Sequence, residues 1–142
     1  MSAGLNKIKI LIVDDHLGMR DGIRAVISAE KDMMVVGEAE NGEEAILQFK
    51  QLRPDVSLID YNLPIICGAD VIDAVRKEFP AARCLVITAF NGDCLQRSIS
   101  AGALGFLHKD MLRRELITAI RAIHDGQQYF PREIMNQMKK NN

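Results

Sequence analysis

Residues 56–64 read Val-Ser-Leu-Ile-Asp-Tyr-Asn-Leu-Pro, an apolar run that ends on a carboxylate, Asp60, and then turns at a proline. A strand at the centre of a parallel sheet would place Asp60 in the crevice at the carboxyl ends of the strands, where open α/β sheets bind their ligands. A single Asp at a strand end is more often a solvated turn residue. The functional interpretation therefore depends on what the other strand ends carry.

The rest of the chain alternates short apolar runs with amphipathic helical patterns. Predicted strands cover residues 7–13, 33–39, 55–60, 83–88 and 105–107, and predicted helices cover residues 17–29, 43–52, 69–79, 93–101 and 111–124. This alternation is typical of an α/β fold, here (βα)5, with parallel strands, right-handed crossovers and helices on both faces. The polar residues 127–142, with Pro131 as a helix start signal, are expected to form a frayed extension.

The composition limits the classes of function. The chain has 142 residues, a common size for one domain, and a formal net charge of −1, which offers no field for direct nucleic-acid binding. Its three cysteines lack Cys-x-x-Cys spacing, so neither a disulfide framework nor a zinc site is indicated. The apolar run at residues 10–13 is too short for a signal peptide or a membrane span. A cytoplasmic protein without membrane association is predicted.

The ends of the first, third, fourth and fifth predicted strands carry Asp14 and Asp15, Asp60, Thr88 and Lys109. The fold would bring these groups into one crevice. Carboxylates are the oxygen ligands that magnesium prefers, with Asp15 and Asp60 as direct ligands and Asp14 acting through water or as an orienting group. Crowded carboxylates repel one another, and a metal ion together with Lys109 would compensate that repulsion.

The same groups suit phosphoryl transfer. An ionised Asp60 can attack a phosphorus atom and form an aspartyl phosphate. The hydroxyl of Thr88 can donate to one phosphoryl oxygen, and the ammonium of Lys109 can neutralise another. Asp60, Thr88 and Lys109 are therefore the predicted catalytic residues. His16, His108 and His124 form no metal-ligand pattern, and each is most simply a surface or loop residue. His16 alone adjoins the acidic pair.

With these residues in this order, the chain resembles the response-regulator receiver domains of two-component signalling over about residues 8–129. The resemblance implies the CheY-like form of the flavodoxin-like fold, a three-layer structure with strand order 2-1-3-4-5. It implies that Asp60 is the phosphoacceptor, that Asp14 and Asp15 are the acidic pair, and that the cofactor is Mg2+, for which Mn2+ can substitute. The backbone carbonyl of Asn62 would be a further metal ligand.

The resemblance also implies a switch and partners. Thr88 would sense the phosphoryl group, and Phe106 matches the family's switch aromatic. The face formed by the last two helices and the fifth strand would then be the output surface. A sensor histidine kinase or phosphotransfer protein would supply the phosphoryl group, and a homodimer is expected. Such a domain is a self-phosphorylating signalling domain, not a turnover enzyme.

Several sequence segments resemble those of receivers that precede a LuxR-type helix-turn-helix domain. These segments are residues 13–16 with Arg20 and Gly22, 37–39, 53–56 and 101–110. The chain departs from that pattern because it ends about where such a domain would begin. Residues 1–129 would form the receiver and residues 130–142 an extension or linker. Transcriptional control through a DNA-binding domain outside this chain, a stand-alone receiver acting by protein–protein contact or phosphorelay, and a receiver used mainly for dimerisation remain open.

Other classes fit less well. A haloacid-dehalogenase phosphohydrolase would carry Asp-x-Asp after the first strand, where this chain has Asp14-Asp15-His16. A flavin- or nucleotide-binding module needs a phosphate-cradling loop there, and acids would repel the phosphate. A receiver that cannot be phosphorylated would not need the complete set of site residues.

The lifetime of the phosphoryl group is predicted from two positions, Asn62 and Phe90, which lie two residues after Asp60 and two after Thr88. In this fold they are expected nearest the path of the water that attacks phosphorus. Asn62 could help to orient that water, whereas Phe90 has no polar atom and would obstruct it. Slow autodephosphorylation is therefore expected.

Overall fold

The structure is a computed structural model, and it describes residues 6–89, 93–132 and 135–136. The first half of the chain forms β1 (Ile8–Val13), α1 (Leu17–Ser28), β2 (Met33–Ala39), α2 (Gly42–Leu52) and β3 (Val56–Asp60). The second half forms α3 (Gly68–Glu78), β4 (Cys84–Thr88), α4 (Asp93–Ala101), β5 (Gly105–His108) and α5 (Leu112–His124).

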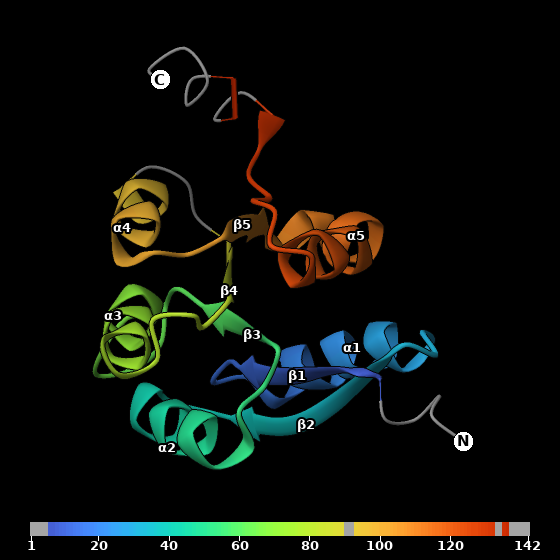
Figure 1. Cartoon of the computed structure of the whole chain (residues 1–142), viewed down its shortest axis with the longest axis horizontal. Coiled ribbons are helices and arrows are strands. Elements are labelled where there is room, and N and C mark those ends of the chain that lie inside the picture. The colour runs from blue at the N-terminus through green and yellow to red at the C-terminus, as the bar shows by residue number, and fades with distance from the viewer. Residues whose placement is uncertain (1–5, 90–92, 133–134, 137–142) are drawn as a thin grey trace.

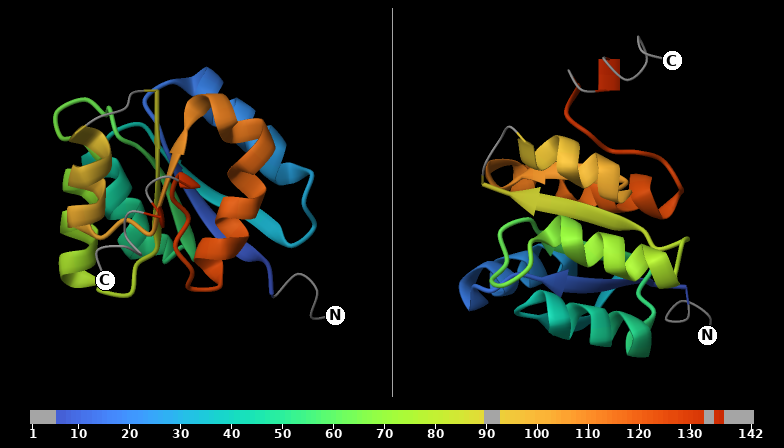
Figure 2. Two further views of the ribbon diagram at one scale, coloured as in Figure 1. Left: turned by 90° about the horizontal axis from the view of Figure 1, so that it is seen from above. Right: turned by 90° about the vertical axis from the view of Figure 1, so that its left-hand side faces the viewer.

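All strand pairs of the sheet are parallel, and the order is β2-β1-β3-β4-β5, which confirms the predicted α/β fold. Figure 1 shows α1 and α5 on one face of the sheet and α2, α3 and α4 on the other. The right-hand view of Figure 2 shows these last three helices stacked side by side. The result is the three-layer arrangement that the alternating pattern predicts.

Two apolar clusters fill the spaces between the layers, because successive residues of a strand point to opposite faces of the sheet. On β1, Ile10 and Ile12 face α1 and α5, whereas Leu11 and Val13 face the other three helices. Strands β3 and β4 are buried along their whole length, as expected for central strands of a parallel sheet. The strand that carries Asp60 is therefore fixed by packing on both faces.

The element ends differ from the predictions by small amounts. Asn41 caps α2, because its side chain accepts a hydrogen bond from the backbone N–H of Glu44, and the helix includes Gly42. A 3-10 turn, Lys109–Met111, precedes α5, which begins at Leu112 and not at Met111. None of the helices in the described part of the chain is long and apolar enough to cross a membrane.

The expected frayed extension is wrong at its start. Tyr129 forms a parallel bridge with Gly105 of β5, and the side chain of Phe130 is buried. Helical structure begins at Arg132, directly after Pro131, as the proline signal predicts. The chain therefore remains attached to the sheet for several residues beyond α5.

Candidate functional site

Three acidic residues meet at the carboxyl ends of β1 and β3. The two strands are neighbours, with Val13 opposite Ile59, so Asp14 and Asp60 follow at the same edge of the sheet. Their side chains are buried, whereas Asp15 is exposed. Carboxylate oxygens of all three, together with a ring nitrogen of His16, lie within 4.8 Å of one another. The cluster is compact enough for one divalent cation, and its oxygen atoms suit magnesium.

Asp60 is held by one contact at each carboxylate oxygen. The backbone N–H of Asn62 donates to Oδ1 at 3.1 Å, and Nζ of Lys109 donates to Oδ2 at 3.3 Å. The same ammonium lies 3.5 Å from Oδ2 of Asp14, so it bridges the two buried acids. This geometry matches the predicted compensation of carboxylate charge by Lys109.

Burial raises the pKa of Asp60 above its ordinary value. The Asn62 N–H opposes this rise, the nearby Asp14 adds to it, and Lys109 opposes it. A buried carboxylate destabilises the fold when it is ionised, and a cation bound beside it would favour the ionised form. A cation held by this cluster would therefore be linked to the ionisation of Asp60, and an ionised carboxylate is the form that can act as a nucleophile.

Thr88 lies at the end of β4, one strand beyond Asp60, and is fully buried. Nδ2 of Asn62 lies 3.5 Å from its Oγ1, so the two residues border the same crevice. Phe106 lies on β5, the next strand, and is only 4% exposed. The order Asp60, Thr88, Phe106 thus runs outward across adjacent strands. The remaining predicted position, Phe90, lies outside the described residues.

Gly68 closes the loop that follows Asp60. Its N–H donates to the carbonyl of Tyr61 at 2.7 Å. A Cβ added at Gly68 would lie 2.5 Å from the backbone oxygen of Asp60, a distance that requires the backbone to shift. Within the same loop, Ile65 is 94% exposed and has a φ of 74°, an uncommon conformation for a β-branched residue.

One residue that supports the site was not predicted. Arg20 lies on α1, and its side chain is only 12% exposed. Its guanidinium donates to the backbone carbonyl of Asp14 at 2.6 Å and to Oε1 of Glu38 at 3.0 Å. Arg20 therefore fixes the backbone that carries the acidic pair. Its separation of only five residues from Asp15 was the available signal.

His16 also belongs to the acidic cluster. Its backbone N–H donates to Oδ1 of Asp14 at 2.8 Å, and its ring Nδ1 lies 3.1 Å from Oδ1 of Asp15. The backbone contact orients Asp14, and the imidazole of the exposed His16 lies beside Asp15. His16 is a surface residue, as predicted, but the sequence did not predict its contacts with both acids.

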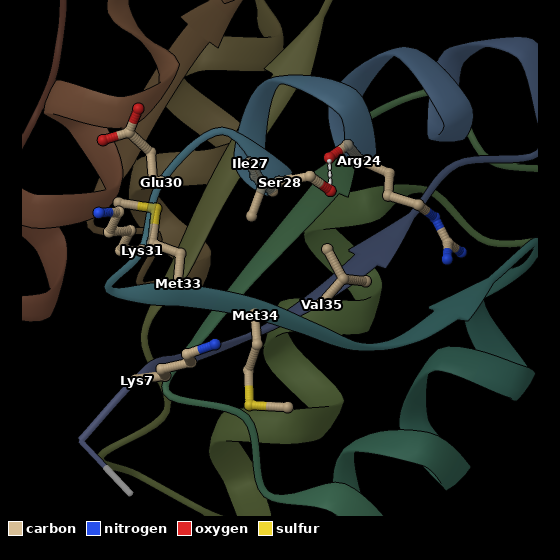
Figure 3. A pocket seen from close by; sticks show the side chains of 9 residues that line it. All are labelled: Lys7, Arg24, Ile27, Ser28, Glu30, Lys31, Met33, Met34 and Val35. Carbon is tan, nitrogen blue, oxygen red and sulfur yellow. Dashed lines mark hydrogen bonds between the residues drawn. The ribbon is translucent and has the colours of Figure 1, made fainter. Parts of the chain in front are cut away.

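A separate groove of about 680 Å3 lies between α1 and β2 and includes Lys7, Arg24 and Lys31. Figure 3 shows the charged ends of Arg24 and Lys31 pointing away from each other. Arg24 is paired with Glu38, so its charge is already compensated. This groove does not gather its cations around one point, and the acidic cluster remains the better candidate.

Comparisons with known proteins agree with this geometry. The response regulator receiver domain matches residues 10–121. The chain is 38% identical over 126 residues to the uncharacterized transcriptional regulatory protein YxjL of Bacillus subtilis, covering 88% of this chain and 58% of that protein. It is 34% identical over 132 residues to the response regulator GacA of Pseudomonas protegens, covering 92% of this chain and 62% of that protein. The chain thus spans about three fifths of these relatives.

Solved structures show the same similarity. A LuxR-family two-component response regulator from Aurantimonas superimposes with a TM-score of 0.87 at 30% identity, covering 95% of this chain and 97% of the other. The receiver domain of the putative response regulator NarL from Mycobacterium tuberculosis gives a TM-score of 0.82 at 35% identity, covering 86% of this chain and 99% of the other.

Proposed function

Because the chain belongs to the response regulator receiver family and is a receiver domain of two-component signalling, we propose that Asp60 is its phosphoacceptor. The observation that carries this proposal is the position of Asp60, buried beside Asp14 and bridged to it by Lys109. The phosphoryl donor is the phosphohistidine of a sensor histidine kinase or of a phosphotransfer protein.

In the proposed step, Oδ2 or Oδ1 of Asp60 attacks phosphorus, and the bond from phosphorus to the donor nitrogen breaks as the imidazole leaves. Lys109 lies within reach of Oδ2, so its ammonium is placed to neutralise charge on a phosphoryl oxygen. The Thr88 hydroxyl, one strand away, donates to a second phosphoryl oxygen. Asn62 fixes the acceptor carboxylate through its backbone N–H.

We propose Mg2+ as the cofactor, with Mn2+ as a substitute. Asp14, Asp15 and Asp60 would hold it, and the backbone carbonyl of Asn62 would complete the protein ligands. The close approach of the carboxylate oxygens supports this assignment. When bound, the ion would offset the repulsion among the acids and neutralise charge on the transferred group.

We propose that phosphorylation controls transcription through a DNA-binding domain that lies outside this chain. The relatives GacA and YxjL, a response regulator and a transcriptional regulatory protein, are longer than the region that the chain matches. A receiver that acts alone through protein contacts is the alternative. Homodimerisation is also proposed, and the apolar groove between α1 and α5, with Ile23 and Leu116 among its residues, is one candidate face.

We further propose slow loss of the phosphoryl group by hydrolysis, tuned by Asn62 and Phe90. Asn62 is exposed and its side-chain amide reaches toward Thr88, so a water molecule can be oriented beside the acceptor. For Phe90 the proposal rests on its sequence position alone.

The test is incorporation of acid-labile phosphate from acetyl phosphate, compared between the wild type and Asp60→Asn, with and without magnesium. Labelling is expected in the wild type with magnesium, and none is expected in the variant, because the amide lacks nucleophilic charge. Asp55→Asn serves as a matched control, since Asp55 contacts the backbone of Lys9 and not the acidic cluster. Equal labelling of wild type and Asp60→Asn would overturn the proposal.

A further inference from the structure

The segment after α5, residues 127–130, lies along the outer edge of β5 and is called here the C-terminal strap. Gly126, with a φ of 84°, turns the chain back toward the sheet after α5. The N–H of Tyr129 donates to the carbonyl of Leu104 at 2.9 Å, and the N–H of Phe106 donates to the carbonyl of Tyr129 at 2.9 Å. Figure 1 shows the chain passing beside β5 as it leaves α5.

Strand β5 is the last strand of the sheet, so its outer backbone groups need partners. The strap supplies them as a short sixth strand, in which Tyr129 pairs with Gly105 in parallel. A Cβ at Gly105 would lie 2.8 Å from the carbonyl oxygen of Tyr129, so only glycine leaves room for the strap at this distance. The glycine on β5 thus allows the strap to approach the edge of the sheet closely.

Two side chains anchor the strap on either side of β5. The hydroxyl of Tyr129 donates to Oε1 of Glu115 on α5. Burial, followed by the contact with Glu115, raises the pKa of Tyr129 to about 12. Phe130 is 6% exposed and joins the apolar cluster that contains Ala103 and Phe106. The strap therefore touches both α5 and the aromatic residue proposed as the switch.

Beyond the strap, the chain forms one wall of a groove of about 790 Å3. Phe106, Met111 and Glu115 lie on its receiver side, and Phe130 and Met135 lie on its C-terminal side. This groove lies on the proposed output face, between β5 and α5. The segment that follows α5 thus lies over the proposed output face.

We propose that the C-terminal strap is an intramolecular cover of the output face, seated while Asp60 is unphosphorylated and loosened when Phe106 repositions. The inference rests on the proposed function of Asp60. Phe106 donates its backbone N–H to the strap and packs in one cluster with Phe130. A shift of the Phe106 ring toward Thr88 changes the packing of the cluster that holds Phe130, and a movement of the Phe106 backbone with its ring weakens the hydrogen bond to Tyr129.

The coupling is reciprocal, because two sites that bias one equilibrium affect each other by the same factor. A phosphoryl group on Asp60 that loosens the strap implies that a loosened strap favours the phosphorylated conformation. Weakening the strap by mutation is then expected to strengthen binding of a phosphoryl analogue at Asp60, although no strap residue touches the acidic cluster.

The test measures amide hydrogen exchange at Phe106 and Tyr129 before and after addition of beryllofluoride with magnesium. We expect exchange at both amides to accelerate by at least about fivefold. Phe130→Ala is expected to accelerate exchange at Tyr129 without beryllofluoride, and to tighten beryllofluoride binding by a similar factor. Tyr129→Phe, which removes only the hydroxyl, gives the same directions if Phe130→Ala proves too unstable. The exposed Gln127→Ala is the matched control and should change neither.

The fluorine spectrum of bound beryllofluoride separates two kinds of failure. If no analogue binds at Asp60, the proposed function fails and the coupling fails with it. If the analogue binds and exchange at Tyr129 stays the same, the proposed function stands and the strap proposal is overturned. Unchanged analogue affinity in both strap variants would overturn it as well.

Discussion

At the scale of the single residue, the site is a balance between a buried acid and the cations that compensate it. Asp60 is 3% exposed and has a raised pKa, chiefly because of burial. Between the unfolded and the folded pKa, the folded state binds more protons, so stability falls as pH rises through that interval. At neutral pH without metal, the ionised Asp60 therefore destabilises the fold that it serves.

Asp60→Asn is accordingly expected to raise the free energy of unfolding of the metal-free protein at neutral pH, by about 1 kcal/mol. The amide resembles the protonated carboxyl in shape and carries no charge. The gain should shrink as pH falls below the ordinary Asp pKa of 3.8, where the wild-type group is protonated in both states. Denaturant melts of both proteins at several pH values measure it, and a less stable variant at neutral pH would contradict the account.

Lys109→Met is expected to have the opposite effect. Its ammonium lies 3.3 Å from Asp60 and 3.5 Å from Asp14, and both acids are buried. Removing it leaves two uncompensated carboxylates, with a loss of about 1–3 kcal/mol after allowance for its partial exposure. Denaturant melts should show a much smaller loss in an Asp60→Asn background, because the variants share one interaction.

The control for this variant is Lys50→Met. Lys50 pairs with Glu78 at 3.2 Å, but both side chains are about half exposed. A surface pair of this kind contributes roughly 0–1 kcal/mol. Equal losses of stability in Lys50→Met and Lys109→Met would show that the Lys109 bridge contributes no more than a surface ion pair.

At the scale of the element, the absence of a side chain at Gly68 lets the loop between β3 and α3 pack closely against the backbone of Asp60. Gly68 begins α3, and a Cβ there would lie 2.5 Å from the carbonyl oxygen of Asp60 and 2.9 Å from Cα of Tyr61. Both neighbours are backbone atoms, which cannot rotate away as a flexible side chain can. The spacing of helix and acceptor strand thus depends on glycine at this position.

Gly68→Ala is therefore expected to destabilise the fold by about 1–3 kcal/mol through overpacking. It should also slow phosphorylation, because the Asp60 backbone must move. The matched control is Gly22→Ala in α1, where an added Cβ meets nothing within 4 Å. That substitution should stabilise by about 0.5–1 kcal/mol through helix propensity. Denaturant melts and phosphorylation rates should be measured on both variants. Equal changes in stability and rate for Gly68→Ala and Gly22→Ala would contradict this explanation.

The elements were predictable from sequence to within one or two residues, and so was the convergence of Asp14, Asp60 and Lys109. The reason is geometric: in a parallel sheet, a residue that ends a strand lies at the same edge as every other strand end. Arg20 was not predictable in this way. Helical periodicity gives the direction of its Cβ, whereas its guanidinium reaches back to the Asp14 carbonyl along a flexible stem.

The C-terminal strap was missed for a different reason. A polar stretch after an amphipathic helix reads as a loop, and Tyr129 with Phe130 is too short to show a strand period. The strap is held by a main-chain contact with β5, more than twenty residues earlier in the chain, and by the buried ring of Phe130. The aromatic pair in an otherwise polar segment was the only available signal.

At the scale of the whole molecule, the acidic cluster and the proposed output face are linked by three adjacent strands. Asp60, Thr88 and Phe106 lie on β3, β4 and β5, in the order of the sheet. Phe106 has no hydroxyl, so in the proposed switch packing and not a new hydrogen bond would favour its displaced position. The Thr88 hydroxyl is then the group proposed to link phosphate to packing.

Thr88→Ala is therefore expected to leave Asp60 phosphorylatable, with a lower rate, while abolishing the response of Phe106 to beryllofluoride. Thr88→Ser keeps the hydroxyl and should retain that response. Spectra of the backbone amides from β4 to β5, recorded with and without the analogue, decide the matter. A Phe106 shift that survives in Thr88→Ala would show that the signal reaches β5 by another route.

The central claim is that, of the clustered acids, Asp60 takes the phosphoryl group in a metal-dependent reaction. The most direct measurement treats the wild-type protein with acetyl phosphate, reduces the acyl phosphate with borohydride and locates the modified residue by peptide mass. Modification is expected at Asp60 with magnesium present, and none is expected after chelation. Modification at Asp14 or Asp15 instead, or equal modification of Asp60 without a divalent cation, would contradict it.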